Sequence, residues 1–161
     1  MRDLRRADNI MKNELFISAV RSIKEHEADR IYCCHGVEHL LDVARVGWRI
    51  AYERGYDLKE DIIYAAALVH DIGRAMEYED GTQHDQGSVI YASKILPECG
   101  YNEEETAQIV MAVAAHRMEN SGMPLSEVLY EADKKTRLCF MCEARKTCKW
   151  PQDMKNMELI Y

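Results

Sequence analysis

The sequence predicts an all-helical protein built as a single compact multi-helix domain. Three observations favour this class: proline and glycine are scarce (3 and 8 of 161 residues), apolar residues recur at helical spacing, and strict polar–apolar alternation is missing. A chain of 161 residues is also long enough to bury a core in one domain. We expect a helical domain over residues 1–136 and a short cysteine-rich C-terminal appendage, residues 137–161, packed on the same domain.

The N-terminal half contains three predicted helices. Residues 8–28 carry a loose apolar stripe among charges, which fits a core-facing helix and a dimer face equally well. Residues 36–54 carry a denser stripe that ends before Gly55, a residue favoured just beyond helix ends. Residues 58–70 are apolar nearly all round, which is typical of a central buried helix. A polar loop around Gly81 should follow.

Three more helices are predicted in the C-terminal half. The helix over residues 84–96 should stop at Pro97, because proline breaks the backbone hydrogen bonding of a helix interior. A helix over residues 102–116 opens with an asparagine cap and three glutamates in its first turn. Another begins at a proline and covers about residues 124–135. Residues 137–150 are rich in cysteine and predicted to be compact rather than one long helix.

Composition and charge exclude several classes of function. The formal net charge of −7 argues against general binding to a nucleic-acid backbone. No apolar run approaches the roughly 20 residues of a membrane helix, and the N-terminus has no apolar stretch of signal-peptide length. We therefore expect no membrane partner and a cytoplasmic location, where the six cysteines would be mostly reduced or bound to metal.

Histidines and aspartates recur in an order that indicates a metal site. Imidazole and carboxylate groups hold divalent transition metals, and an adjacent His-Asp pair offers one nitrogen and one oxygen ligand. That pair lies at the end of the highly apolar helix. Burying its two polar side chains there would be costly unless they were paired or bound to a metal. The other ligands are distant in sequence, so the fold must bring helix ends together. The candidates are His39, His70, Asp71, His84, His116 and Asp133.

These residues resemble those of the HD-domain metal-dependent phosphohydrolase family. The resemblance covers about residues 35–135. Three segments carry it: HGVEHLLDV (35–43), LVHDIGR (68–74) with the His-Asp pair that names the family, and EADK (131–134) with its Ala-Asp context. Two histidines add to it, one at the start of residues 84–96 and one at the end of residues 109–116.

The resemblance implies a ligand set and a choice of metals. A one-metal site would use His39, His70, Asp71 and Asp133. A two-metal site adds His84 and His116, with Asp71 as the bridge, and this dinuclear interpretation is preferred. In the alternative, one metal is bound and His84 and His116 bind phosphate. Fe, Mn, Co or Ni suits nitrogen ligands better than Mg.

The activity that the resemblance implies is hydrolysis of a phosphoric ester by metal-activated water. The substrate would be a nucleotide or another small phosphorylated metabolite. Asp71 would serve as a catalytic residue, and Arg74, Lys134 and Arg117 are candidate phosphate-binding groups. Two alternatives stay open, since some two-metal members hold iron and oxidise a substrate with O₂, and an HD module can also act as a non-catalytic ligand sensor.

Two other histidines carry separate predictions. His35 lies one helical turn before His39, so it either donates to a substrate oxygen or caps the start of the helix. His26 lies in a polar run of charged residues and is predicted to be a solvated surface residue.

The cysteine-rich segment is a second candidate metal site. Cys139, Cys142 and Cys148 follow the pattern C-x₂-C-x₅-C, and thiolates at this spacing bind zinc or an iron–sulfur cluster. A fourth ligand could come from Cys33, Cys34 or Cys99, or from solvent. The alternative is a set of buried reduced thiols without metal.

Overall fold

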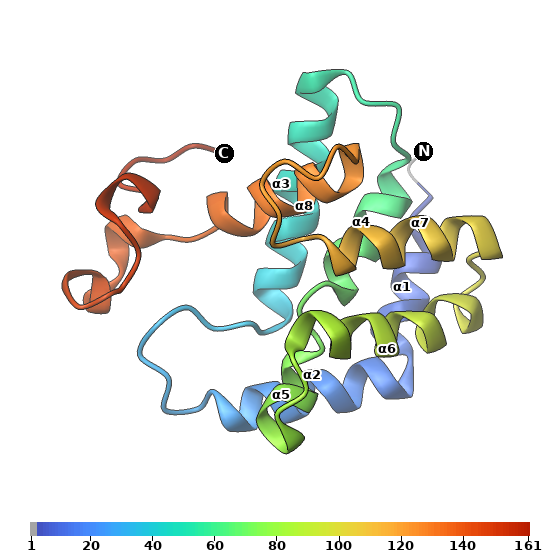
Figure 1. Ribbon diagram of the computed structural model, residues 1–161, viewed down its shortest axis with the longest axis horizontal. Coiled ribbons are helices and arrows are strands. Elements are labelled where there is room, and N and C mark those ends of the chain that lie inside the picture. The colour runs from blue at the N-terminus through green and yellow to red at the C-terminus, as the bar shows by residue number, and fades with distance from the viewer. Residues whose placement is uncertain (1–2) are drawn as a thin grey trace.

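Eight α-helices form most of the chain in the computed structural model, which describes residues 3–161 (Figure 1). No β-strand occurs within these residues, as the helical periodicity predicts. The helices are α1 (Arg5–Lys12), α2 (Glu14–His26), α3 (Val37–Arg54), α4 (Glu60–Val69), α5 (Arg74–Asp80), α6 (His84–Glu98), α7 (Glu103–Ala114) and α8 (Pro124–Lys135), and three short 3₁₀ turns follow at Cys139–Met141, Glu143–Lys146 and Gln152–Met154.

Helix α4 is the centre of the core. It packs against α1, α3, α6, α7 and α8, and side chains all round it, including Ile63 and Leu68, are fully buried. A helix enclosed on every side needs no polar face, so its nearly continuous apolar sequence is explained and the prediction of a central helix is confirmed. Because α4 ends inside the molecule, the residues that follow it emerge in the interior.

The single helix predicted over residues 8–28 is wrong, because the structure breaks it at Asn13. The Asn13 side chain accepts hydrogen bonds from the amides of Leu15 and Phe16 and so caps the start of α2. The apolar stripe itself faces inward, since Ile10 of α1 and Phe16 of α2 are buried in the core. The core-facing interpretation of this stripe therefore holds.

Helix α5 occupies part of the region predicted as a polar loop. It is seven residues long and ends at Gly81, whose φ of 82° is the left-handed conformation common after helix ends. Two turns with a single buried residue, Ala75, leave too little periodicity for a sequence pattern to detect. The predicted stop at Pro97 is also displaced, because this residue lies in the last turn of α6, which ends at Glu98.

The predicted starts of α7 and α8 are confirmed. Asn102 accepts a hydrogen bond from the amide of Glu105, whose carboxylate accepts one from the amide of Asn102, so the two residues form a capping box. Helix α8 begins at Pro124 and ends at Lys135. The helix that leads toward His116 ends at Ala114 and leaves that histidine in the following turn.

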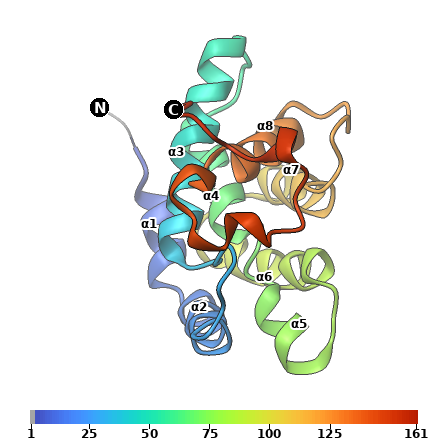
Figure 2. The same cartoon turned by 90° about the vertical axis from the view of Figure 1, so that its left-hand side faces the viewer.

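The C-terminal segment contains only short turns, as its sequence predicts. It lies in front of α3 and α4 in Figure 2, and Asn156 fastens it by donating to the carbonyl oxygens of Lys134 (2.7 Å) and Arg137 (2.8 Å). Among the described residues, Cys139 is the one buried apolar residue after Ala132, and it lies outside the main core cluster. The proposed division at residue 136 stays a prediction. None of the helices in residues 3–161 is long and apolar enough to cross a membrane.

Candidate metal centre

The six predicted ligands come from helix ends that meet at one place in the molecule. This convergence brings together residues up to 94 positions apart in sequence (39 to 133). In chain order they are His39 in the first turn of α3, His70 and Asp71 directly after α4, His84 as the first residue of α6, His116 just beyond α7, and Asp133 in the last turn of α8.

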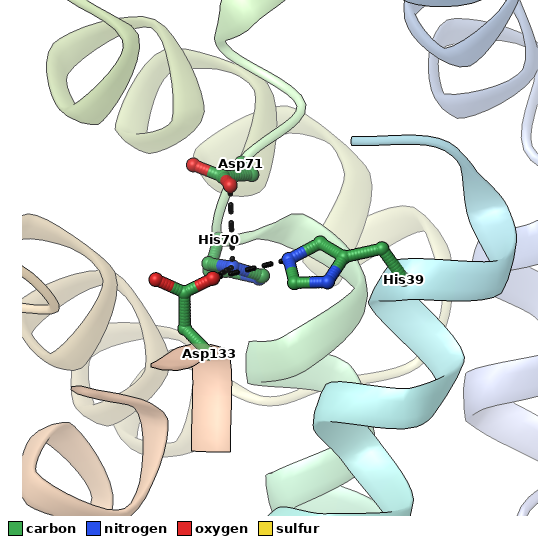
Figure 3. Close-up of side chains that lie close together, drawn as sticks. All are labelled: His39, His70, Asp71 and Asp133. Atoms are coloured by element: carbon green, nitrogen blue, oxygen red, sulfur yellow. Dashed lines mark ion pairs between the residues drawn. The ribbon is translucent and has the colours of Figure 1, made fainter. Parts of the chain in front are cut away.

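One group contains His39, His70, Asp71 and Asp133, whose ligand atoms all lie within 4.8 Å of one another. Figure 3 shows these side chains pointing toward a common centre. Nε2 of His39 lies 3.1 Å and Nε2 of His70 3.8 Å from Oδ1 of Asp133. Nε2 of His70 is also 3.5 Å from Oδ2 of Asp71. The four residues can supply two nitrogen and two oxygen ligands to one ion.

A second group contains Asp71, His84 and His116. Nε2 of His84 and Nε2 of His116 are each 3.7 Å from Oδ1 of Asp71. Asp71 therefore faces the first group with Oδ2 and the second group with Oδ1. One carboxylate directed at two groups of ligands has the geometry of a bridge between two ions.

The burial and hydrogen bonding of these residues indicate whether they suit a metal ion. His70 and Asp71 are almost fully buried, with 0% and 3% exposure. Nε2 of His70 and Oδ1 of Asp71 have no hydrogen-bond partner, although buried polar atoms are normally paired. These unpartnered atoms are the ones directed at the ligand groups, so a divalent ion would remove the desolvation penalty that the protein now bears. The donor set fits a transition metal.

Backbone carbonyl groups fix the orientation of two histidines. Nδ1 of His70 donates to the carbonyl oxygen of Ala67, and Nδ1 of His116 donates to that of Val113, both at 2.6 Å. A carbonyl oxygen can only accept, so the proton of the neutral ring resides on Nδ1 and leaves a lone pair on Nε2. This is the tautomer that binds a metal through Nε2.

Electrostatics favour the metal-binding protonation states of several ligands. Burial lowers the pKa of His39 and of His116 to about 4, which leaves both rings neutral at neutral pH. Burial raises the pKa of Asp71, but His70 and Arg74 lower it more, and the net direction is downward. Metal ligands must be neutral imidazoles and ionised carboxylates, and the pKa shifts of His39, His116 and Asp71 have these directions. At His70 burial lowers the pKa, but Asp71 and Asp133 raise it more, so a bound cation would have to displace that proton.

The predicted phosphate-binding residues lie at the edge of this centre. Nε of Arg74 is buried without a hydrogen-bond partner, 3.6 Å from Oδ1 of Asp71. Nζ of Lys134 lies 4.0 Å from Oδ2 of Asp133 and 3.5 Å from the centre of the Tyr130 ring. Arg117 is exposed but lines the same cavity. All three cations face the cavity of the ligand groups.

Sequence reasoning missed two residues that contact the ligands. Arg137 donates through Nη2 toward Nε2 of His39 (3.1 Å) and Oδ1 of Asp133 (3.2 Å). Glu77 of α5 lies 3.3 Å from Nδ1 of His84 through its carboxylate oxygens. An i,i+4 spacing from Asp133 is the sequence signal that could have indicated Arg137. Glu77 gave no comparable signal, because its helix was not predicted.

His35 is a buried member of the site rather than a helix cap. Helix α3 has Gly36 as its N-cap and no side-chain capping bond. Nδ1 of His35 is 2.5 Å from Oε1 of Glu27, which also accepts from the Tyr78 hydroxyl, and Nε2 of His35 is 4.0 Å from Oδ2 of Asp71. His26 is exposed, as predicted.

A cavity of about 750 Å³ opens over the ligand groups. Its volume lies in the range of about 300–1,000 Å³ usual for small-molecule sites. The C-terminal segment forms part of the wall through Cys148, Lys149, Trp150 and Met154. The segment predicted as an appendage thus contributes to the cavity over the candidate centre.

An all-helical domain that gathers four histidines and a second aspartate around one buried aspartate defines a class of protein with a candidate two-ion centre. Comparison with known proteins agrees. The model of the HD domain family matches residues 36–147, well over half of the chain. The chain therefore belongs to the HD-domain family.

The similar proteins differ in the share of their own length that this chain matches. An uncharacterized protein from Clostridium beijerinckii is 36% identical over 152 residues, 94% of this chain and 96% of that protein. Ribonuclease Y 1 from Pediococcus pentosaceus is 34% identical over 80 residues, 50% of this chain but 14% of that protein. The crystal structure of a predicted HD superfamily hydrolase from an uncultured Thermotogales bacterium shares the fold, with a TM-score of 0.64 at 24% identity, over 89% of this chain and 80% of that one.

Proposed function

We propose that this protein is a metal-dependent phosphohydrolase that acts on a nucleotide or another small phosphorylated metabolite. One observation supports the proposal above all: two groups of ligands share Asp71, whose buried Oδ1 has no hydrogen-bond partner. The cations around the cavity add to it, because a phosphorylated substrate brings negative charge to the centre.

The proposed centre holds two ions. His39, His70 and Asp133 would bind one, His84 and His116 the other, and Asp71 both. The equal 3.7 Å distances from Oδ1 of Asp71 to the second pair of histidines support this assignment over a single ion. When bound, such ions supply a water of lowered pKa as nucleophile and neutralise charge on the phosphoryl group. Fe, Mn, Co or Ni suits the nitrogen-rich ligand set better than Mg.

The protein's own groups would bind and orient the substrate. Arg74 presents a buried guanidinium nitrogen without a partner and can donate to a phosphoryl oxygen. Lys134 brings a second cation, with Nζ 4.0 Å from Oδ2 of Asp133. Asp71 stays ionised beside these cations, so it can hold its two ligand groups in place while the substrate enters.

Replacing Arg74 with alanine should raise KM by about 10-fold or more, since a charge-assisted hydrogen bond contributes about 1.5–3 kcal/mol. Metal content should stay unchanged, because Arg74 belongs to neither ligand group. Arg45→Ala is the matched control: Arg45 is an exposed arginine paired with Asp42 on α3, and its loss should leave KM unchanged. Steady-state kinetics beside elemental analysis would check this, and equal KM values for the two variants would contradict the role of Arg74.

The proposed function is tested by restoring activity to metal-free protein. Chelator-treated protein should release no inorganic phosphate, and Mn²⁺, Co²⁺, Ni²⁺ or Fe²⁺ should restore release from at least one nucleotide or small phosphate ester. The panel should include a short oligoribonucleotide, followed by the appearance of shorter fragments instead of phosphate, because several relatives are named ribonuclease Y. O₂ consumption with the iron form would instead support an oxygenase. Tight nucleotide binding without turnover under every metal would support a ligand sensor, and either result would contradict the proposal.

A further inference from the structure

Five of the six cysteines line one cavity beside the His/Asp centre, and His39 lines it as well. Cys34 is exposed, and the other four are buried or partly buried. Cys33 comes from the loop between α2 and α3, and Cys139, Cys142 and Cys148 come from the C-terminal segment. Together they line a cavity of about 790 Å³. All four are free thiols. Residues more than 100 positions apart thus bring thiols to one place, where the loop and the C-terminal segment lie on the same side of the molecule (Figure 1).

Local hydrogen bonds hold these two segments together. Nη1 of Arg137 donates to the carbonyl oxygen of Cys34 (2.9 Å), and the Tyr32 hydroxyl donates to that of Thr147 (3.3 Å). Within the C-terminal segment, the amide of Cys142 donates to the carbonyl oxygen of Cys139 (3.2 Å), which folds the C-x₂-C sequence into a turn. Two thiols at this spacing are a common half of a tetrahedral zinc site.

Two cysteines stay outside this grouping. Cys34 lines the same cavity but is exposed, and its thiol donates to the carbonyl oxygen of Tyr32 at 3.6 Å. Cys99 is buried at the end of α6 and does not line this cavity.

The C-terminal segment lacks the usual means of stabilisation. Among residues 3–161, Cys139 is the one buried apolar residue after Ala132, and the longest regular element after α8 is a 3₁₀ turn of four residues. Cys142 and Cys148 are only partly buried, so packing as inert apolar thiols explains them poorly. Small segments without a core of their own are commonly stabilised by a disulfide or a metal, and here the thiols are free.

We propose that Cys33, Cys139, Cys142 and Cys148 bind one structural Zn²⁺ ion that fixes the C-terminal segment to the loop between α2 and α3. Among the described residues, the ligand atoms within 4.8 Å of one another belong to the two His/Asp groups. The four sulfur atoms are not within that distance of one another, so the thiols would have to move closer together around the ion to reach tetrahedral geometry.

This zinc site would complete the cavity of the candidate centre. Cys33 and Cys148 line both cavities, and the residues directly after Cys148, Lys149 and Trp150, form part of the wall above the His/Asp ligands. An ion that fixes Cys148 therefore fixes Lys149 and Trp150 at the substrate cavity. The proposed zinc ligands differ from the ligands of the proposed hydrolytic centre, so the zinc site can be tested whether or not the protein is a hydrolase.

The first test separates the two metal sites by variants. Asp71→Asn disables both His/Asp groups, and protein carrying it, purified without added metal, should retain about one zinc equivalent per chain. Adding Cys139→Ser and Cys142→Ser together should remove that zinc, while adding Cys99→Ser, a matched control outside the cavity, should not. Circular dichroism would confirm that each variant is folded. Zinc that is absent from Asp71→Asn, or that persists in the double cysteine variant, would overturn the proposal, and so would iron with acid-labile sulfide.

A second test uses the intact cysteines in case the double variant does not fold. In Trp48→Phe protein, Trp150 is the remaining tryptophan. Zinc removal by a chelator should shift the emission of Trp150 toward that of an exposed indole, and added Zn²⁺ should reverse the shift. Co²⁺ in place of zinc should give the thiolate-to-metal absorption of a tetrahedral site. Unchanged Trp150 emission after zinc loss, or a cobalt spectrum without thiolate bands, would overturn the proposal.

Discussion

Replacing Asp71 with asparagine is expected to remove metal from both ligand groups and to lower hydrolysis by more than about 100-fold, beyond the 10–100-fold typical of changes to groups that only orient a ligand. The expectation follows from geometry, because Oδ2 of Asp71 faces His70 and Oδ1 faces His84 and His116. Asparagine keeps the shape of the side chain but removes the charge that would attract two cations. Elemental analysis and phosphate release under the same metal conditions would measure both effects.

The matched control is Glu77→Gln, which removes a carboxylate from the same region without removing a ligand. Glu77 contacts Nδ1 of His84 and is partly exposed. Its loss should weaken metal affinity by about 10–100-fold, and excess metal should restore activity. Excess metal should not rescue Asp71→Asn. Two metal equivalents and unchanged hydrolysis in Asp71→Asn would contradict the role of Asp71 as the bridge.

The convergence of the six candidate ligands could be predicted from sequence because their order and their helical context are both visible there. The continuous apolar run of α4 identifies it as the central helix, and a His-Asp pair at its end must then lie in the interior. The asparagine before α7, the glutamates in its first turn and the proline that opens α8 indicate where those helices begin. These local signals are strong because the asparagine side chain pairs an amide that the helix start leaves without a partner, and proline has no amide hydrogen to pair.

The residues that surround the ligands could not be predicted in the same way. Glu27 lies at the end of α2, and its contact with His35 depends on the path of the loop between α2 and α3. Arg137 lies beyond α8 in a segment predicted as an appendage, yet its guanidinium contacts His39 and Asp133. Such contacts arise from tertiary packing between segments with no shared periodicity, so the sequence carries no signal for them beyond the i,i+4 spacing of Arg137 from Asp133.

The close approach of two glycines explains how His84 reaches Asp71. An added Cβ at Gly73 would lie 2.0 Å from the carbonyl oxygen of His84 and 2.1 Å from the amide nitrogen of Ser88. The amide of Gly73 also donates to Oγ of Ser88 at 2.9 Å. The turn that carries Asp71 therefore packs backbone to backbone against the first turn of α6, and Gly87 is its partner there. A side chain at Gly73 would push the two segments apart.

We expect Gly73→Ala to lower the free energy of unfolding by about 3 kcal/mol, at the upper end of the cost of overpacking, because backbone atoms cannot rotate away. The φ of −62° at Gly73 is allowed for alanine, so the loss comes from the clash and not from backbone strain. Separation of His84 from Asp71 should also remove about one metal equivalent while the group of His39, His70 and Asp133 remains.

Gly36→Ala is the matched control for this substitution. Its Cβ would meet Oε2 of Glu38 at 3.1 Å, the end of a flexible side chain that can move away. The expected loss is about 1 kcal/mol or less, the usual effect of alanine at a helix N-cap. Urea unfolding with chelator present compares the two without a contribution from metal binding. Equal stability of the two variants would mean that the turn after α4 can shift away from α6, and the proximity of Asp71 to His84 would then need another cause.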